Sequence, residues 1–220
     1  MKKIHTVIWD CDGVVWKNEK NLQPIAKNLE IANYEEFSKQ CHEFFNKFSE
    51  HFKNKKVNMP ETLQMADKIM PILGIHSIAP ITFFRALRDT KLEICSFNND
   101  AILLMKYLQS KGIKNIIKTD WWKEIQEVVL SHYGVMEYVE ELHYCNDEYL
   151  KINPKSTENL IKKGREDGYV IIGDSLKSDI AFAEHADIKS IWYNPYNKEN
   201  ATQMKPTYEV TSLLEVMDII

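Results

Sequence analysis

The chain of 220 residues lacks the sequence signatures of several common enzyme classes. Its four cysteines form no CxxC pair and its seven histidines form no HxH or HExxH motif, so no zinc-binding spacing is present. GxSxG, GxGxxG and Walker-type GxxxxGKS/T motifs are also absent, which leaves serine hydrolases, dinucleotide-binding domains and P-loop NTPases without support. What remains is chemistry centred on carboxylates.

The chain also has little net charge and no long apolar run. Its net charge is −4 and its basic residues form no local patch, so we expect no nucleic acid polymer as a partner. The first apolar run, residues 4–9, is too short to span a membrane and ends at an acidic cluster. We therefore expect a cytoplasmic monomer or homodimer with reduced thiols and no membrane attachment.

Short runs of β-branched and aromatic residues alternate with helical patterns along most of the chain. Strands are predicted at residues 4–9, 113–118, 141–145, 169–173 and 189–193. Helices are predicted at residues 101–110, 122–133, 156–166 and 178–185. Strands alternating with helices of this length predict an α/β fold with a Rossmann-like parallel sheet.

Residues 17–95 interrupt this alternation. One face of a predicted helix there carries a stripe of apolar side chains, namely Phe37, Cys41, Phe44, Phe45, Phe48 and Phe52. Further helices are predicted at residues 62–73 and 81–88. We interpret the stripe as core packing and residues 17–95 as an inserted α-helical cap domain, with the catalytic core formed by residues 1–16 and 96–220.

Acidic residues follow two of the predicted strands. Asp10 and Asp12 lie in the motif DCDG, and Asp174 and Asp179 lie in GDSLKSD. Ligands bind at the carboxyl edge of such sheets, and residues at i and i+2 of an extended segment point the same way. Carboxylates gathered there need a cation, and Mg²⁺ prefers carboxylate, water and phosphate oxygens. DCDG taken alone favours a turn or helix cap, but the second pair favours a magnesium site.

Two further residues at this edge suit a phosphate group. Thr119 follows a predicted strand, where its hydroxyl can donate to a phosphate oxygen or can simply cap the next helix. Lys151 precedes a proline-marked turn and offers a positive charge. Ser96 is an alternative to Thr119, and Lys155 is an alternative to Lys151.

Taken together and in this order, the motifs resemble those of the haloacid dehalogenase superfamily, in particular its phosphatases. The four motifs of that family match Asp10 with Asp12, then Thr119, then Lys151, then Asp174 with Asp179. The resemblance covers residues 1–16 and 96–215, and residues 173–195 (GDSLKSDIAFAEHADIKSIWYNP) carry it most closely.

The chain departs from the family pattern at three positions. Asp120 stands where Asn is usual, Ile152 follows Lys151 where Pro is common, and Asp187 replaces a usual Gly. The last change is tolerable because Asp can adopt the left-handed backbone conformation. The helical insert resembles the cap that many members carry after the first motif.

The resemblance implies a phosphatase that acts on a small phosphorylated metabolite, of the sugar phosphate or nucleotide type. Asp10 would be the nucleophile and would form an aspartyl-phosphate, while Asp12, with a raised pKa, would act as acid and base. Mg²⁺ would be held by Asp10, the backbone carbonyl of Asp12, and Asp174, with Asp179 orienting them. Trp16, Trp121 and Trp122 are candidates for contacts to the substrate, although packing explains each of them too.

Two alternatives stay open at this point. The first is a phosphomutase of the same fold, which the core motifs do not distinguish from a phosphatase. The second is a receiver-like domain that is phosphorylated on aspartate without turnover, although such domains place the acceptor Asp on a middle strand and carry no helical insert.

Overall fold

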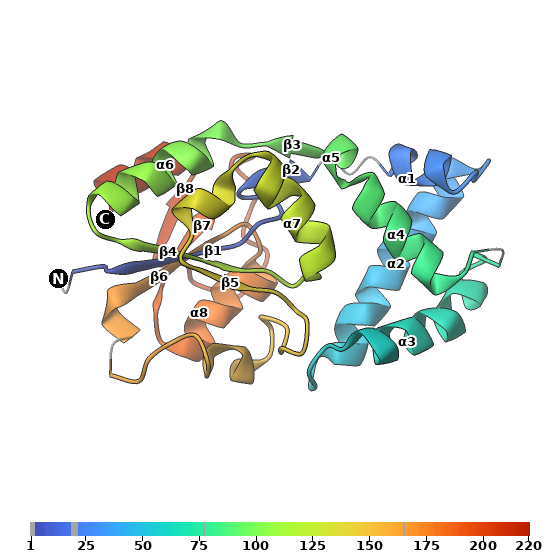
Figure 1. The fold of residues 1–220 in the computed structure, drawn as a ribbon. Helices are drawn as coiled ribbons and strands as arrows, with labels where there is room; N and C mark the ends of the chain where they lie inside the picture. Colours follow the sequence, from blue (N-terminus) through green and yellow to red (C-terminus); the bar gives the residue numbers. More distant parts are fainter. Residues whose placement is uncertain (1–2, 19–21, 77, 165) are drawn as a thin grey trace.

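A computed structural model describes residues 3–18, 22–76, 78–164 and 166–220. Its centre is a parallel six-stranded sheet with the order β5-β4-β1-β6-β7-β8, shown in Figure 1. The strands are β1 (Thr6–Trp9), β4 (Lys114–Lys118), β5 (Glu141–His143), β6 (Tyr169–Gly173), β7 (Lys189–Tyr193) and β8 (Tyr208–Val210). The predicted Rossmann-like α/β fold is therefore confirmed.

The central strands of the sheet are buried on both faces, and alternate residues of β1, β4 and β6 belong to different apolar clusters. Val7 and Trp9 of β1 pack in one cluster with residues of α6 (Asn99–Ser110) and α7 (Lys123–His132). Ile8 packs in the other cluster with Phe182 of α8 (Ala181–Ala186). Figure 1 accordingly places α6 and α7 over one face of the sheet and α8 over the opposite face. This layering fixes the register, because a slip of one residue would exchange the two faces.

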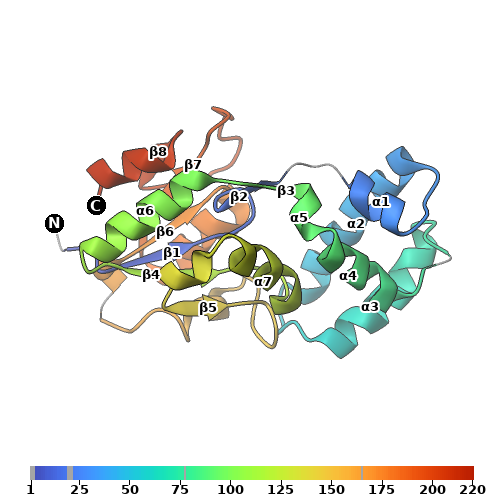
Figure 2. The ribbon, with the colours of Figure 1, turned by 45° about the horizontal axis from the view of Figure 1, so that its top comes forward.

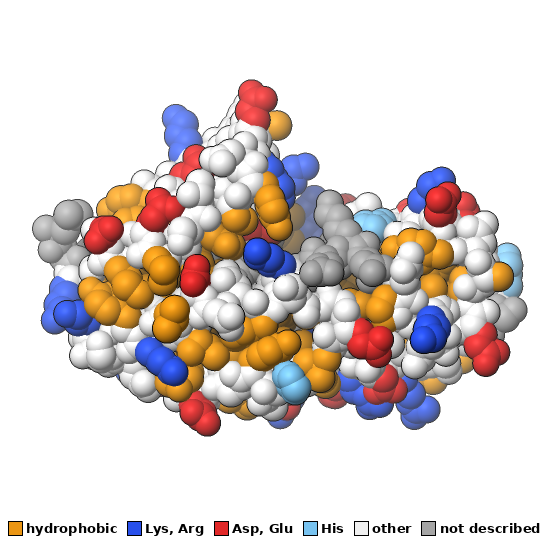
Figure 3. Space-filling view, turned by 90° about the horizontal axis from the view of Figure 1, so that it is seen from above, with side chains coloured by type: hydrophobic (Ala, Val, Ile, Leu, Met, Phe, Trp, Pro, Cys, Tyr) orange, Lys and Arg blue, Asp and Glu red, His pale blue; other side chains and the backbone are white. Residues whose placement is uncertain are grey.

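β2 (Trp16–Asn18) and β3 (Cys95–Phe97) pair as an antiparallel two-stranded sheet, and the described residues between them form five helices. These helices are α1 (Gln23–Asn28), α2 (Tyr34–Phe52), α3 (Met59–Ile72), α4 (Pro80–Asp89) and α5 (Lys91–Ile94). They lie together at one end of the six-stranded sheet, and the β2–β3 pair lies at the junction (Figure 2). The face drawn in Figure 3 is indented where the two parts meet. That residues 17–95 act as a separate cap domain stays a proposal.

The aromatic stripe of α2 forms core, as predicted. Five of its six members are buried and Phe45 is half-buried. Phe48 of the stripe and Phe84 of α4 also contact the start of α7, since their rings each lie 4.9 Å from the ring of Trp122. No described helix is long and apolar enough to cross a lipid bilayer.

Part of the sequence-based assignment is wrong. The described part of residues 156–166 forms no α-helix; Pro154–Thr157 is a short 3₁₀ helix, followed by turns. The apolar residues Leu160 and Ile161 are adjacent, not at helical spacing, and Gly164 has a φ of 79°. Predicted helix 178–185 starts instead with a π-helical turn, Leu176–Ile180, ahead of α8. The prediction also missed β2, β3 and β8, each of which has only three residues.

Candidate active site

Three strands deliver polar residues to one edge of the sheet. Trp9 of β1 is in register with Ile117 of β4 and with Ile172 of β6. The residues that follow these strands therefore gather at the carboxyl edge, where Asp10 donates its backbone N–H to the carbonyl of Ile172 at 3.0 Å. Asp10, Thr119 and Asp174 therefore all lie at this edge of the sheet, directly after three neighbouring strands.

The acidic cluster consists of Asp10, Asp174 and Asp179, with one carboxylate oxygen from each lying within 4.8 Å of the others. Lys151 joins it, because its Nζ donates to Oδ1 of Asp10 and to Oδ1 of Asp179, both at 2.5 Å. Oδ2 of Asp179 accepts the backbone N–H of Ser175 at 3.0 Å. Among the described residues, no hydrogen bond reaches the Asp174 carboxylate.

The donor set fits a hard divalent cation. Three carboxylates face one ammonium, so the ionised cluster has excess negative charge, and its free donors are oxygens of the kind Mg²⁺ prefers. Both oxygens of Asp179 are already engaged by protein groups, whereas Asp174 is available. Asp179 is thus placed to orient Lys151 and the Ser175 loop.

Two glycines permit this crowding. A β-carbon at Gly13, whose φ is 93°, would collide with the carboxylate of Asp174. A β-carbon at Gly173 would collide with the side chain of Asp179. Larger residues at either position would push the carboxylates apart.

The charges at this edge shift several ionisation equilibria. Burial, opposed by Lys151 but reinforced by the neighbouring carboxylates, raises the pKa of Asp10 well above its ordinary value. Burial and the charge of Asp179 raise the pKa of Asp174 to about 7. Burial alone would lower the pKa of Lys151, but Asp10 and Asp179 hold it well above its ordinary value, so the ammonium stays charged.

Thr119 and Lys151 are anchored by neighbouring loops. Oγ1 of Thr119 accepts hydrogen bonds from the backbone of Trp121 at 3.3 Å and from Nε2 of Gln126 at 3.0 Å. Asp120 accepts the backbone N–H of Lys151 at 2.8 Å and the hydroxyl of Ser178 at 3.3 Å. The carboxylate of Asp120 thus ties together the loops that follow β4, β5 and β6.

The two alternative residues lie elsewhere. Ser96 is in β3, which pairs with β2 outside the six-stranded sheet. Lys155 is exposed, with its Nζ 5.8 Å from the ring centre of Tyr149. Lys151, by contrast, is 2% exposed and contacts the cluster directly.

Asp12 stands beside the cluster and faces another set of partners. Its Oδ1 accepts hydrogen bonds from Nζ of Lys91 at 2.8 Å and from Nε1 of Trp16 at 3.1 Å, and its Oδ2 accepts one from Nε2 of Gln126 at 2.6 Å. Burial would raise the pKa of Asp12, but the charge of Lys91 and these hydrogen bonds together lower it below the ordinary value. The expectation of a raised pKa for Asp12 is therefore wrong, because a buried ammonium lies against it.

Sequence reasoning missed Lys91 and Gln126. Lys91 lies in the short helix α5 and carried no motif. Gln126 did carry a signal, since it is a polar residue on the apolar face of α7, between Trp122 and Leu130 at helical spacing. Of the three tryptophans considered for substrate contacts, Trp16 and Trp122 are buried, Trp16 with its Nε1 hydrogen-bonded to Asp12, and Trp121 is half-buried.

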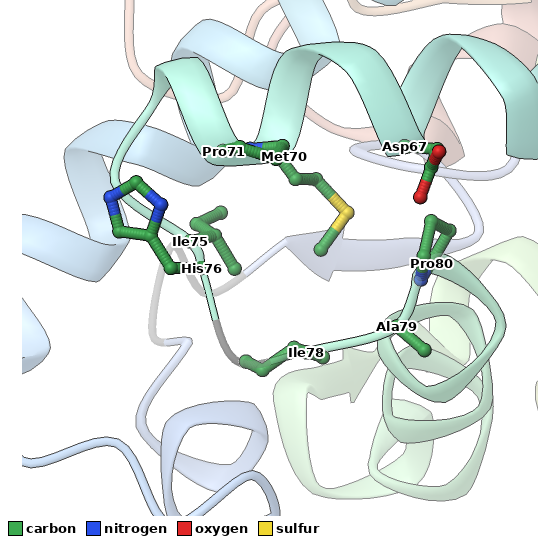
Figure 4. Close-up of a pocket in the computed structure, with 8 residues that line it drawn as sticks. All are labelled: Asp67, Met70, Pro71, Ile75, His76, Ile78, Ala79 and Pro80. Atoms are coloured by element: carbon green, nitrogen blue, oxygen red, sulfur yellow. The ribbon is translucent and has the colours of Figure 1, made fainter.

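Two cavities bear on where a ligand could lie. A cavity of about 190 Å³ adjoins the cluster and is lined in part by Gly13, Lys17, Asp174, Tyr196 and Lys198. A cavity of about 340 Å³ lies between α3 and the start of α4 (Figure 4). Its lining is mostly apolar, and its two ionisable residues, Asp67 and His76, lie at opposite ends, so it offers no catalytic arrangement.

Known proteins share both the sequence pattern and the fold. A sequence model of the haloacid dehalogenase-like hydrolases matches residues 4–187. Pyrimidine 5'-nucleotidase PynA of Streptococcus pneumoniae is 49% identical over 51 residues, which are 23% of this chain and 22% of PynA. Pyrimidine 5'-nucleotidase YjjG of Escherichia coli is 24% identical over 148 residues, 66% of this chain and 65% of YjjG. The alignments thus span less than two thirds of either relative.

Among solved structures, the magnesium-bound HAD-hydrolase YfnB of Bacillus subtilis matches with a TM-score of 0.77. The match is 20% identical and covers 99% of each chain, and the structure of YfnB reveals interdomain movement. Structures of 2-haloacid dehalogenases match the fold as well, so the fold by itself fits more than one hydrolytic reaction.

Proposed function

The chain belongs to the haloacid dehalogenase-like hydrolases, and we propose that it is a magnesium-dependent phosphatase for small phosphate monoesters. The observation that carries the proposal is the convergence of Asp10, Asp174, Asp179 and Lys151 at the carboxyl edge of the sheet. Two relatives are named pyrimidine 5'-nucleotidases, so nucleoside 5'-monophosphates are the first substrate class, ahead of sugar phosphates.

In the proposed reaction, a carboxylate oxygen of Asp10 attacks phosphorus in line and the P–O ester bond breaks. Asp12, in the protonated form that Lys91 disfavours, gives its proton to the leaving oxygen, and the product is an alcohol and an aspartyl-phosphate on Asp10. Water then attacks this phosphorus, Asp12 takes the proton, and inorganic phosphate leaves with Asp10 restored.

Other residues bind the transferred group. Thr119 Oγ1 accepts two hydrogen bonds, so its own O–H is left to donate to a phosphate oxygen. The Lys151 ammonium lies against Asp10 and can neutralise a second phosphate oxygen. Mg²⁺, held by Asp10, the backbone carbonyl of Asp12 and Asp174, would offset negative charge on the phosphoryl group.

Asp12 distinguishes this proposal from dehalogenation. A carbon–halogen bond breaks with loss of a halide, which needs no proton, whereas an alkoxide leaving from phosphorus does. A carboxyl group beside the nucleophile therefore favours phosphate ester hydrolysis.

A substrate panel tests the proposal. With Mg²⁺ present, we expect phosphate release from nucleoside 5'-monophosphates, sugar phosphates or p-nitrophenyl phosphate, and no halide release from 2-chloropropionate. Halide release without phosphate release would contradict it. Movement of the phosphoryl group within a sugar phosphate, without release of free phosphate, would indicate the phosphomutase alternative. A stable phosphoprotein without turnover would indicate the receiver-like alternative.

Asp12→Asn tests the acid role. Because kcat/KM reports the steps up to departure of the leaving group, it should fall roughly 10²–10⁴-fold for a nucleoside 5'-monophosphate. It should fall much less for p-nitrophenyl phosphate, since p-nitrophenolate leaves without protonation. An equal loss for both substrates would assign Asp12 another role.

A further inference from the structure

The Asp12 carboxylate is held on both sides by side chains from separate elements. Lys91 of α5 and Trp16 of β2 bind Oδ1, and Gln126 of α7 binds Oδ2. The separations along the chain are 79 residues for Lys91 and 114 for Gln126, so the arrangement exists only in the folded protein. It leaves the carboxylate little freedom to rotate.

Lys91 is buried where a lysine side chain is costly. It is 2% exposed, and its Nζ lies 5.6 Å from the ring centre of Trp16 and 4.9 Å from that of Trp121. A buried ammonium is retained only when a partner compensates for lost hydration, and here the compensating carboxylate is Asp12. Since α5 is the last helix before β3, Lys91 also connects the helical segment to Asp12.

Gln126 is a second buried side chain that binds Asp12, and its own amide oxygen is left without a hydrogen bond from any described residue. It is fully buried, and its Nε2 donates to Asp12 at 2.6 Å and to Thr119 at 3.0 Å. Its Oε1 is buried and finds no hydrogen-bond partner among the described residues. The reverse amide orientation would point Oε1 at the carboxylate, so these two contacts set the orientation.

We propose that Lys91 and Gln126 are positioning residues that clamp Asp12 in the orientation needed for proton transfer to the leaving group. The inference rests on the phosphatase activity proposed above. It assigns to Lys91 an action through Asp12, not through the substrate, and it makes hydrolysis of esters with poor leaving groups depend on a residue of α5.

The primary experiment compares two substrates with the full-length protein and saturating Mg²⁺. For Lys91→Met, kcat/KM should fall about 10–100-fold for a nucleoside 5'-monophosphate, because a displaced acid transfers its proton poorly even though loss of the ammonium raises its pKa. For p-nitrophenyl phosphate it should fall less than about threefold, since that leaving group needs no acid. Gln126→Leu should change the ratio between the two substrates in the same direction.

A double-mutant cycle separates action through Asp12 from direct substrate contact. In the Asp12→Asn background, Lys91→Met should cost no more than about threefold in kcat/KM for the nucleotide. If the two losses multiply in full, or if Lys91→Met slows both substrates equally, the inference is overturned.

Lys118→Met is the matched control. Lys118 is another fully buried lysine, paired with Glu148 at 2.5 Å and not with Asp12, so any loss should be equal for both substrates. Circular dichroism checks folding, and if Lys91→Met does not fold, Lys91→Gln and Gln126→Leu carry the same comparison. Absence of phosphate release by the unmodified protein would contradict the proposed function, whereas release with an unchanged substrate ratio in the variants would contradict only the clamp.

Discussion

Asp10→Asn lowers kcat for phosphate release by at least about 10⁴-fold in the expected result. The amide of Asn is not a nucleophile, and no other carboxylate takes the place of Asp10 directly after β1. The fold should persist, because Asn has the same size and Lys151 keeps its contact with Asp179 at 2.5 Å. Initial rates of phosphate release measure the effect, and intact mass spectrometry should detect phosphate bound to the unmodified protein but not to Asp10→Asn.

Asp67→Asn is the matched control for this substitution. Asp67 is an exposed residue of α3 that lines the cavity of about 340 Å³ away from the sheet edge. We expect its kcat to stay within about twofold of the unmodified protein, as for most surface substitutions. Substantial turnover by Asp10→Asn would show that the nucleophile is a different residue.

We expect removal of divalent cations to abolish hydrolysis. EDTA should stop phosphate release and added Mg²⁺ should restore it, because Asp10, Asp174 and Asp179 carry more negative charge than Lys151 balances. Ca²⁺ should substitute poorly, since it takes more oxygen ligands at longer distances than Mg²⁺. Full activity in EDTA would contradict the metal assignment.

The same metal site should bind Mg²⁺ more weakly as the pH falls below about 7. Burial and Asp179 raise the pKa of Asp174 to about 7, and the carboxyl group must lose its proton to coordinate the cation. In the metal-free protein a raised carboxyl pKa favours the folded state at low pH, and this contribution is lost as the pH rises through about 7.

Thermal unfolding measures both effects. The increase in Tm on adding Mg²⁺ should be larger at pH 8 than at pH 6, and a concentration of 100 times Kd should add about 2.7 kcal/mol to the free energy of unfolding. In Asp174→Asn the difference between the two pH values should become smaller, and the part that comes from Asp10 should remain. An increase that is larger at pH 6 would exclude Asp174 as the titrating ligand.

Patterns within a few residues were sufficient for much of the fold. The apolar runs before Asp10 and Asp174 predicted β1 and β6, because a strand buried on both faces needs continuous apolar residues. The expectation that Asp187 tolerates the left-handed conformation also holds, since its φ is 53° at the end of α8. Where the pattern was short or irregular, as in β8 and residues 156–166, the prediction failed.

The sequence by itself determined which residues directly follow the strands, because the position of a motif is a property of the chain. That β1, β4 and β6 are neighbours in the sheet is a property of the tertiary structure. Only the tertiary structure decided that Lys151, and not Lys155, contacts Asp10 across 141 residues, and that Lys91 and Gln126 enclose Asp12. The lowered pKa of Asp12 follows from that enclosure, not from the motif DCDG. Backbone preference and periodicity act between near neighbours, whereas the charge and hydrogen-bond environment of a buried carboxylate depends on segments that only packing brings together.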